Sequence, residues 1–73
     1  MKKTIYEDDY KTFIKLLKKA RLAAGLTQVQ VANDFGATQA YISKVESGQL
    51  RVDVLELKKF AKIYKKEIRY FIK

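Results

Sequence analysis

The segment FGATQAYISK, residues 35–44, decides how this 73-residue chain folds. Gly36 suits the end of a helix, because glycine adopts the left-handed conformation that commonly follows a last helical turn. Thr38 suits the N-cap of the next helix, where its hydroxyl can accept a hydrogen bond from a backbone amide. Only Ala37 and Thr38 lie between the turn and the second helix, so we expect the two helices to meet at a steep angle.

The helix that begins after Thr38 has two chemically different faces. At 100° per residue, Ile42 and Val45 point to one side, which we assign to the core. The opposite face carries small and polar side chains as far as the end of the helix: Gln39, Ala40, Ser43, Lys44 and Ser47. An exposed polar face is ordinary in a small domain, so its meaning depends on the rest of the chain.

The remaining sequence predicts further helices and no convincing strand. Proline is absent, and each of the three glycines falls where a periodic apolar pattern stops, which is typical of a helix end or a turn. The predicted helices cover residues 8–24, 27–36 and 38–47, a fourth helix starting at residue 53, and a short last helix over residues 67–72. We therefore expect an all-α domain that comprises residues 1–73, with residues 1–7 flexible.

Two of these helices begin with the same signal, a pair of residues that are three positions apart in the chain. Thr27 is followed three residues later by Gln30, and Asp53 is followed three residues later by Glu56. This spacing is that of a capping box, in which two backbone amides at the start of a helix are satisfied reciprocally.

Composition limits the classes of function. Sixteen Lys and Arg residues against eight Asp and Glu residues give a net charge of +8, which favours a polyanionic partner such as nucleic acid or an acidic membrane surface. There is no cysteine and no histidine, so thiolate or imidazole catalysis and zinc fingers are excluded, and we expect no enzyme, no metal and no cofactor. No apolar run is long enough for a membrane span or a secretion signal, so we expect a cytoplasmic protein, associated with the nucleoid when it is bound to DNA.

From Arg21 to Gly48 the sequence reads R-x-x-x-G-L-T-Q-x-x-x-A-x-x-x-G-x-T-Q-x-x-I-S-K-V-E-S-G. This string resembles the Xre-type, or Cro/repressor, helix-turn-helix family. The resemblance extends to about residue 72, whereas the helix before Arg21 fits by pattern only. It implies a compact five-helix, lambda-repressor-like domain with a helix-turn-helix core at about residues 27–47.

The resemblance also implies DNA-contacting residues. Gln28 matches a glutamine that contacts a phosphate at a helix N-terminus, although it could be an ordinary solvated residue. Gln39 and Ala40 match the start of a recognition helix, where a glutamine can read adenine and a methyl group can touch thymine. Ser43 and Lys44 lie one turn further on, and Lys44 could bind either a guanine or a phosphate.

Four other positions have assignments that the sequence leaves less defined. Thr38 and Arg51 are candidate phosphate contacts, but capping alone would explain Thr38 and solvation alone would explain Arg51. Arg21 and Glu46 match a structural ion pair that orients the recognition helix. Ala40 stands where a longer polar side chain is often found, so fewer bases are expected to be read directly and DNA shape gains weight.

The resulting hypothesis is a sequence-specific DNA-binding transcriptional regulator, a repressor that binds double-stranded DNA at a palindromic operator as a homodimer. We look for the dimer contact near the C-terminus, where core packing is the alternative use of the four candidate residues: Ile63, Tyr70, Phe71 and Ile72. A phage repressor, a restriction–modification controller and an antitoxin with a toxin partner remain alternatives, as does a helix-turn-helix scaffold that binds protein. A membrane-surface peptide is disfavoured, since the apolar faces match one another.

Overall fold

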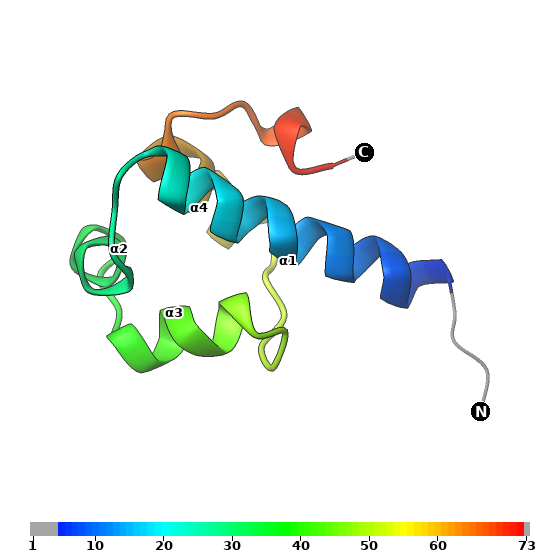
Figure 1. The fold of residues 1–73 in the computed structure, drawn as a ribbon, viewed down its shortest axis with the longest axis horizontal. Helices are drawn as coiled ribbons and strands as arrows, with labels where there is room; N and C mark the ends of the chain where they lie inside the picture. Colours follow the sequence, from blue (N-terminus) through cyan, green and yellow to red (C-terminus); the bar gives the residue numbers. More distant parts are fainter. Residues whose placement is uncertain (1–4, 73) are drawn as a thin grey trace.

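The computed structural model describes residues 5–72, and the regular secondary structure within this range consists of helices alone, as predicted. The elements, labelled in Figure 1 where there is room, are α1 (Ile5–Ala23), α2 (Gln28–Phe35), α3 (Gln39–Glu46), α4 (Val54–Tyr64) and a 3₁₀-helix, η1 (Ile68–Tyr70). Figure 1 shows α2 nearly end-on while α3 lies across the view, so the two helices meet at the steep angle expected from their short connection. None of the helices in the described range is long and apolar enough to cross a membrane.

The helix starts follow the local signals in the sequence. Both capping boxes are present, because Thr27 and Gln30 exchange side-chain and backbone hydrogen bonds, and Asp53 and Glu56 do the same. The Thr38 Oγ1 atom accepts from the backbone amide of Tyr41 at 3.1 Å and so caps α3. These bonds satisfy amides that no helical carbonyl can reach, and they confirm the three predicted start sites.

The first helix begins earlier than predicted. It starts at Ile5, and its first turn contains Glu7 and Asp8, whose negative charges suit the positive end of a helix dipole. Of the segment 1–7 that we expected to be flexible, residues 1–4 lie outside the described residues, and the remaining three are helical. In Figure 1 the N-terminal half of α1 projects past the rest of the domain.

The predicted fifth α-helix is wrong, and a single 3₁₀ turn takes its place. α4 ends at Tyr64 and is followed by the C-cap Lys65, which has the left-handed φ of 58° that is more usual for glycine. The chain then passes through Glu67 in an extended conformation, with no side-chain cap, before η1. So few residues cannot repay the cost of nucleating an α-helix, whereas one 3₁₀ turn is enough to direct Phe71 into the core.

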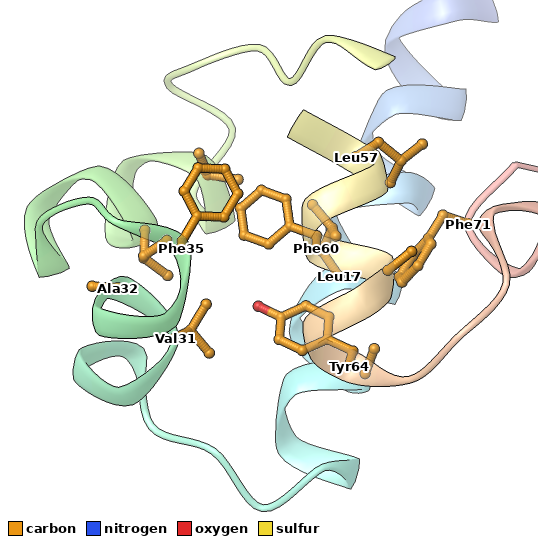
Figure 2. Close-up of a cluster of buried hydrophobic side chains, with 12 residues drawn as sticks. Leu17, Val31, Ala32, Phe35, Leu57, Phe60, Tyr64 and Phe71 are labelled. Carbon is orange, nitrogen blue, oxygen red and sulfur yellow. The ribbon is translucent and has the colours of Figure 1, made fainter. Parts of the chain in front are cut away.

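The core lies where α1, α2, α3 and α4 meet, and Figure 2 shows its aromatic side chains. The Phe60 ring lies 4.6 Å from the ring of Phe35 and 5.9 Å from that of Tyr64. Phe71 is only 2% exposed and meets Phe13 edge-on, so our assignment of Phe71 to a dimer surface was wrong. This packing fixes α3 on one side of the domain, with its polar face outward.

Candidate nucleic-acid interface

The predicted division of α3 into a buried and an open face is observed. Ile42 and Val45 are fully buried against the core, while Gln39, Ala40 and Lys44 are exposed and Ser43 is half-buried. The core contacts therefore hold α3 by its apolar face, and the polar face remains available to a ligand.

A buried ion pair joins the end of α1 to the end of α3. The Arg21 guanidinium donates from Nε to Glu46 Oε2 at 2.6 Å and from Nη2 to Glu46 Oε1 at 3.1 Å, and its Nη1 donates to the carbonyl oxygen of Leu26. The two side chains are only 9% and 6% exposed. The hydrogen bond to Glu46 raises the pKa of Arg21 above its ordinary value, so the guanidinium is charged at every working pH.

Two glutamines extend this pair to the surface. Gln28 Nε2 donates to Glu46 Oε1 at 3.0 Å, and Gln39 Nε2 donates to Gln28 Oε1 at 2.6 Å. We call the four side chains Arg21, Glu46, Gln28 and Gln39 the relay. All four residues are recognisable in the sequence, but their spacing does not predict that they form one hydrogen-bonded chain.

The direction of the relay follows from its carboxylate. An ionised carboxylate only accepts hydrogen bonds, so Gln28 must turn its amide nitrogen toward Glu46 and its oxygen toward Gln39. Gln39 must then turn its own nitrogen toward Gln28. This arrangement leaves the Gln39 Oε1 acceptor and one N–H donor for a ligand, in a fixed orientation.

Tyr41 provides a second attachment of α3. Its hydroxyl donates to Glu56 Oε2 at 3.0 Å, while its ring lies 5.5 Å from that of Phe35. Glu56 is at the same time the capping residue of α4, since its Oε1 accepts from the amide of Asp53. Tyr41 therefore packs against the core and links α3 to the start of α4.

The Tyr41 contact predicts a loss of stability at alkaline pH. Burial, and then the hydrogen bond to Glu56, raise the pKa of Tyr41 from 10.0 to about 12. The unfolded chain thus loses this proton first, so the free energy of unfolding should fall between pH 10 and about pH 12. Burial also raises the pKa of Tyr64, which adds to the decline.

Thermal unfolding followed by circular dichroism on both sides of pH 10 checks this prediction. The variant Tyr41→Phe should show a shallower decline than the wild type, with the remainder due to Tyr64. Equal slopes for the two proteins would contradict the assignment to Tyr41.

Arg51 lies apart from the relay. Its guanidinium sits 4.2 Å above the centre of the Tyr10 ring, and the Tyr10 hydroxyl donates to the carbonyl oxygen of Leu50 at 3.2 Å. The sequence analysis missed Tyr10, because no local pattern connects a residue of α1 to the loop after α3. Arg51 is exposed, but its side chain is ordered because the guanidinium stacks on this ring.

One lysine of α4 has a structural role at the end of α2. Lys59 donates to the carbonyl oxygen of Phe35 at 2.9 Å and lies over its ring, so it caps the end of α2. In the part of the chain that the structure describes, no group of three or more carboxylates could hold a metal ion.

A helix capped by Thr38, set steeply across a preceding helix and presenting an ordered glutamine to solvent, is the arrangement of a helix-turn-helix DNA-binding domain. The Helix-turn-helix family model matches residues 17–71. The chain belongs to this family, and to its XRE type, and it is a DNA-binding transcription regulator.

Two solved structures are similar over most of their length. An XRE-family like protein from Pseudomonas syringae pv. tomato str. DC3000 is 32% identical, with a TM-score of 0.87 over 93% of this chain and 83% of that protein. The restriction-modification controller protein C.AhdI from Aeromonas hydrophila is 29% identical, with a TM-score of 0.83 over 94% of this chain and all of that protein. No curated protein matches the chain significantly.

Proposed function

We propose that the protein is a sequence-specific repressor that binds a palindromic operator as a homodimer, with α3 in the major groove of each half-site. The observation that carries the proposal is the ordered amide of Gln39, which is exposed at the start of α3 and oriented by the relay. A reading helix needs side chains at its N-terminal end that are both accessible and fixed in direction.

Gln39 is the proposed base-reading residue. Adenine presents an acceptor, N7, and a donor, the N6 amino group, in the major groove, and the amide of a glutamine can pair with both. The relay leaves Gln39 with one N–H donor and the Oε1 acceptor, which is the set that adenine requires. The exposed methyl group of Ala40 is proposed to touch a thymine methyl beside it.

Other residues are proposed to contact the DNA backbone. Gln28 keeps one N–H after donating to Glu46, and this N–H lies at the start of α2, where a helix dipole attracts a phosphate. The Thr38 hydroxyl accepts the capping bond and still has its own proton to donate. Ser43 is assigned to a base or sugar edge, while Lys44 and Arg51 are assigned to phosphates.

The dimer follows from the size of the site. One module of this kind covers only about 600–1,000 Å² of DNA-facing surface, which restricts its affinity and specificity. Two neighbouring apolar side chains at the start of α4, Val54 and Leu55, are 63% and 67% exposed and are proposed to contribute to the contact between two chains. Among the biological contexts, the similarity to a restriction-modification controller favours a controller over an antitoxin.

Selection of bound sites from a random duplex pool, combined with native mass spectrometry of the complex, tests the proposal. We expect an enriched palindrome with half-sites about one helical turn apart and two chains per duplex. Recovery of no motif would reject sequence-specific binding, and one chain per duplex would reject the dimer. A reporter gene placed behind the selected site should be repressed, and activation would contradict the assignment as a repressor.

Lys44 offers a separate test of the phosphate contacts. The variant Lys44→Ala should weaken binding to all sequences to a similar degree, because a phosphate contact carries no base information. Removing one contact should lower the slope of log affinity against log salt by about 0.9. Fluorescence anisotropy at several salt concentrations measures both quantities, with Lys62→Ala on α4 as the matched control. A change of base preference would instead assign Lys44 to a guanine.

A further inference from the structure

Besides the core that they share, α3 is connected to α4 by a loop and by a hydrogen bond. The loop covers residues 47–53 and has no regular secondary structure (Figure 1). α3 packs mainly on α1 and α2, and α4 packs on the same two helices. The hydrogen bond from the Tyr41 hydroxyl to Glu56 Oε2, at 3.0 Å, therefore bridges two helices that do not lie along one another.

The carboxylate of Glu56 is held at both of its oxygen atoms. Oε1 accepts from the amide of Asp53 at 2.9 Å, and the amide of Glu56 itself donates to Asp53 Oδ1 at 2.8 Å. Oε2 accepts from Tyr41, whose ring lies 5.5 Å from that of Phe35. A side chain that is bonded at both oxygens has little rotamer freedom left, so α3 and the first turn of α4 are held in one relative position.

The same turn of α4 carries the proposed contact between two chains. Val54 and Leu55 lie between Asp53 and Glu56 in the chain, and the side chains of both are mostly exposed. The capping box fixes the backbone on either side of this apolar pair. The hydrogen bond from Tyr41 to Glu56 thus links the proposed chain-to-chain contact to the helix that is proposed to read DNA.

In a two-fold dimer, the distance between the two copies of α3 is determined within each chain. The position of α3 relative to the contact between chains sets how far apart the two half-sites must lie. One helical turn of about 34–36 Å contains about 10–10.5 base pairs, so one inserted base pair moves a half-site by about 3.4 Å and turns it by about 35° around the duplex. A dimer whose α3 helices are held rigidly cannot follow this displacement, whereas a dimer with less constrained helices can follow it in part.

We propose that the hydrogen bond from Tyr41 to Glu56 sets the half-site spacing that the dimer accepts, with Tyr41 as a positioning residue that reads no base itself. The inference rests on the proposed dimer and operator, and it deepens them by naming a residue that determines specificity for spacing. The hydroxyl is the group that matters, because the ring of Tyr41 packs beside Phe35 whether or not the hydroxyl is present.

Operators that differ in half-site spacing measure this role. The selected palindrome is lengthened or shortened by one base pair at its centre, and the spacing ratio is the affinity for the selected operator divided by the affinity for the altered one. Tyr41→Phe keeps the ring and removes the bond, so the spacing ratio should fall about tenfold, the factor that corresponds to one hydrogen bond to a charged group. Base preference within each half-site and the mass of the dimer should stay as in the wild type. The control Thr12→Val removes a hydroxyl hydrogen bond within α1, to the carbonyl oxygen of Asp8, and should leave the spacing ratio unchanged.

A conservative change of Glu56 and the stoichiometry of the complex complete the test. In Glu56→Gln the amide oxygen can accept from Asp53 and the amide nitrogen can donate to the Tyr41 oxygen, so the spacing ratio should be retained. A wild-type spacing ratio in folded, dimeric Tyr41→Phe would overturn the spacing role, and a ratio that Glu56→Gln lowers as much as Tyr41→Phe does would overturn its assignment to this bond. One chain per duplex, or no recovered palindrome, would instead reject the proposed dimer or operator, and the spacing role with it.

Discussion

Replacing Arg21 by methionine is expected to lower the free energy of unfolding by about 3–5 kcal/mol, a large part of the stability of so small a domain. The change leaves the carboxylate of Glu46, whose side chain is only 6% exposed, without its cationic partner. Glu46→Leu should have an effect of similar size, since it leaves the guanidinium of Arg21 buried and uncompensated.

The double variant Arg21→Met/Glu46→Leu separates the value of the pair from the penalty of breaking it. It should be much less destabilised than the sum of the single variants, because no buried charge remains. Urea unfolding followed by circular dichroism measures all three, and the solvent-exposed pair of Glu67 and Arg69 supplies the control, since Glu67→Ala should change little. Losses near 1 kcal/mol in both single variants would mean that the buried pair behaves like a surface pair.

Replacing Gln39 by alanine is expected to cost about 1–3 kcal/mol at one base pair of each half-site, which corresponds to a five- to 150-fold loss in preference. The loss should be confined to that base pair, because alanine removes the donor and the acceptor that pair with adenine while leaving the backbone contacts in place. Competition binding against the four operators that differ at this position measures the preference. A uniform loss on all four would assign Gln39 to the DNA backbone.

The relay predicts that Gln28 influences the same base pair without touching it. Gln28→Met keeps the length of the side chain but cannot accept the N–H of Gln39, so the amide of Gln39 loses its fixed direction. We expect a smaller loss of preference at the position that Gln39 reads, together with a loss of one phosphate contact. Unchanged preference in Gln28→Met would show that Gln39 orients itself on the base without help.

Local signals in the sequence were sufficient for the starts of α2, α3 and α4 and for the turn between α2 and α3. Three helices are capped through hydrogen bonds between residues three positions apart, with Thr27, Thr38 and Asp53 as the capping residues. Because these bonds join close neighbours in the chain, they can be predicted from the sequence alone. Gly36 has the left-handed φ of 83° that its position predicted. The end of α4 was not signalled, because a lysine occupies the left-handed position that glycine usually fills.

The four residues of the relay were all named from the sequence, but the geometry of the relay was not predicted. The residues of the relay were named because they match a family pattern, yet nothing in their spacing reveals which amide faces which carboxylate. The stack of Arg51 on Tyr10 was missed for the same reason, since it joins two segments that only the folded chain brings together. The hydrogen bond from Tyr41 to Glu56 was missed for this reason too, because it joins two different helices.

The relay divides the polar face of α3 into two kinds of position. Gln39 is bonded through Gln28 to the pair that stabilises the fold, whereas Ser43 and Lys44 make no side-chain hydrogen bond to any other described residue, and Ala40 has no group to bond. Substitutions at these three positions should therefore be tolerated by the fold. We therefore expect operator preference to diverge by mutation at Ala40 and Ser43 without loss of a hydrogen bond, whereas a mutation of Gln39 also breaks its hydrogen bond to Gln28.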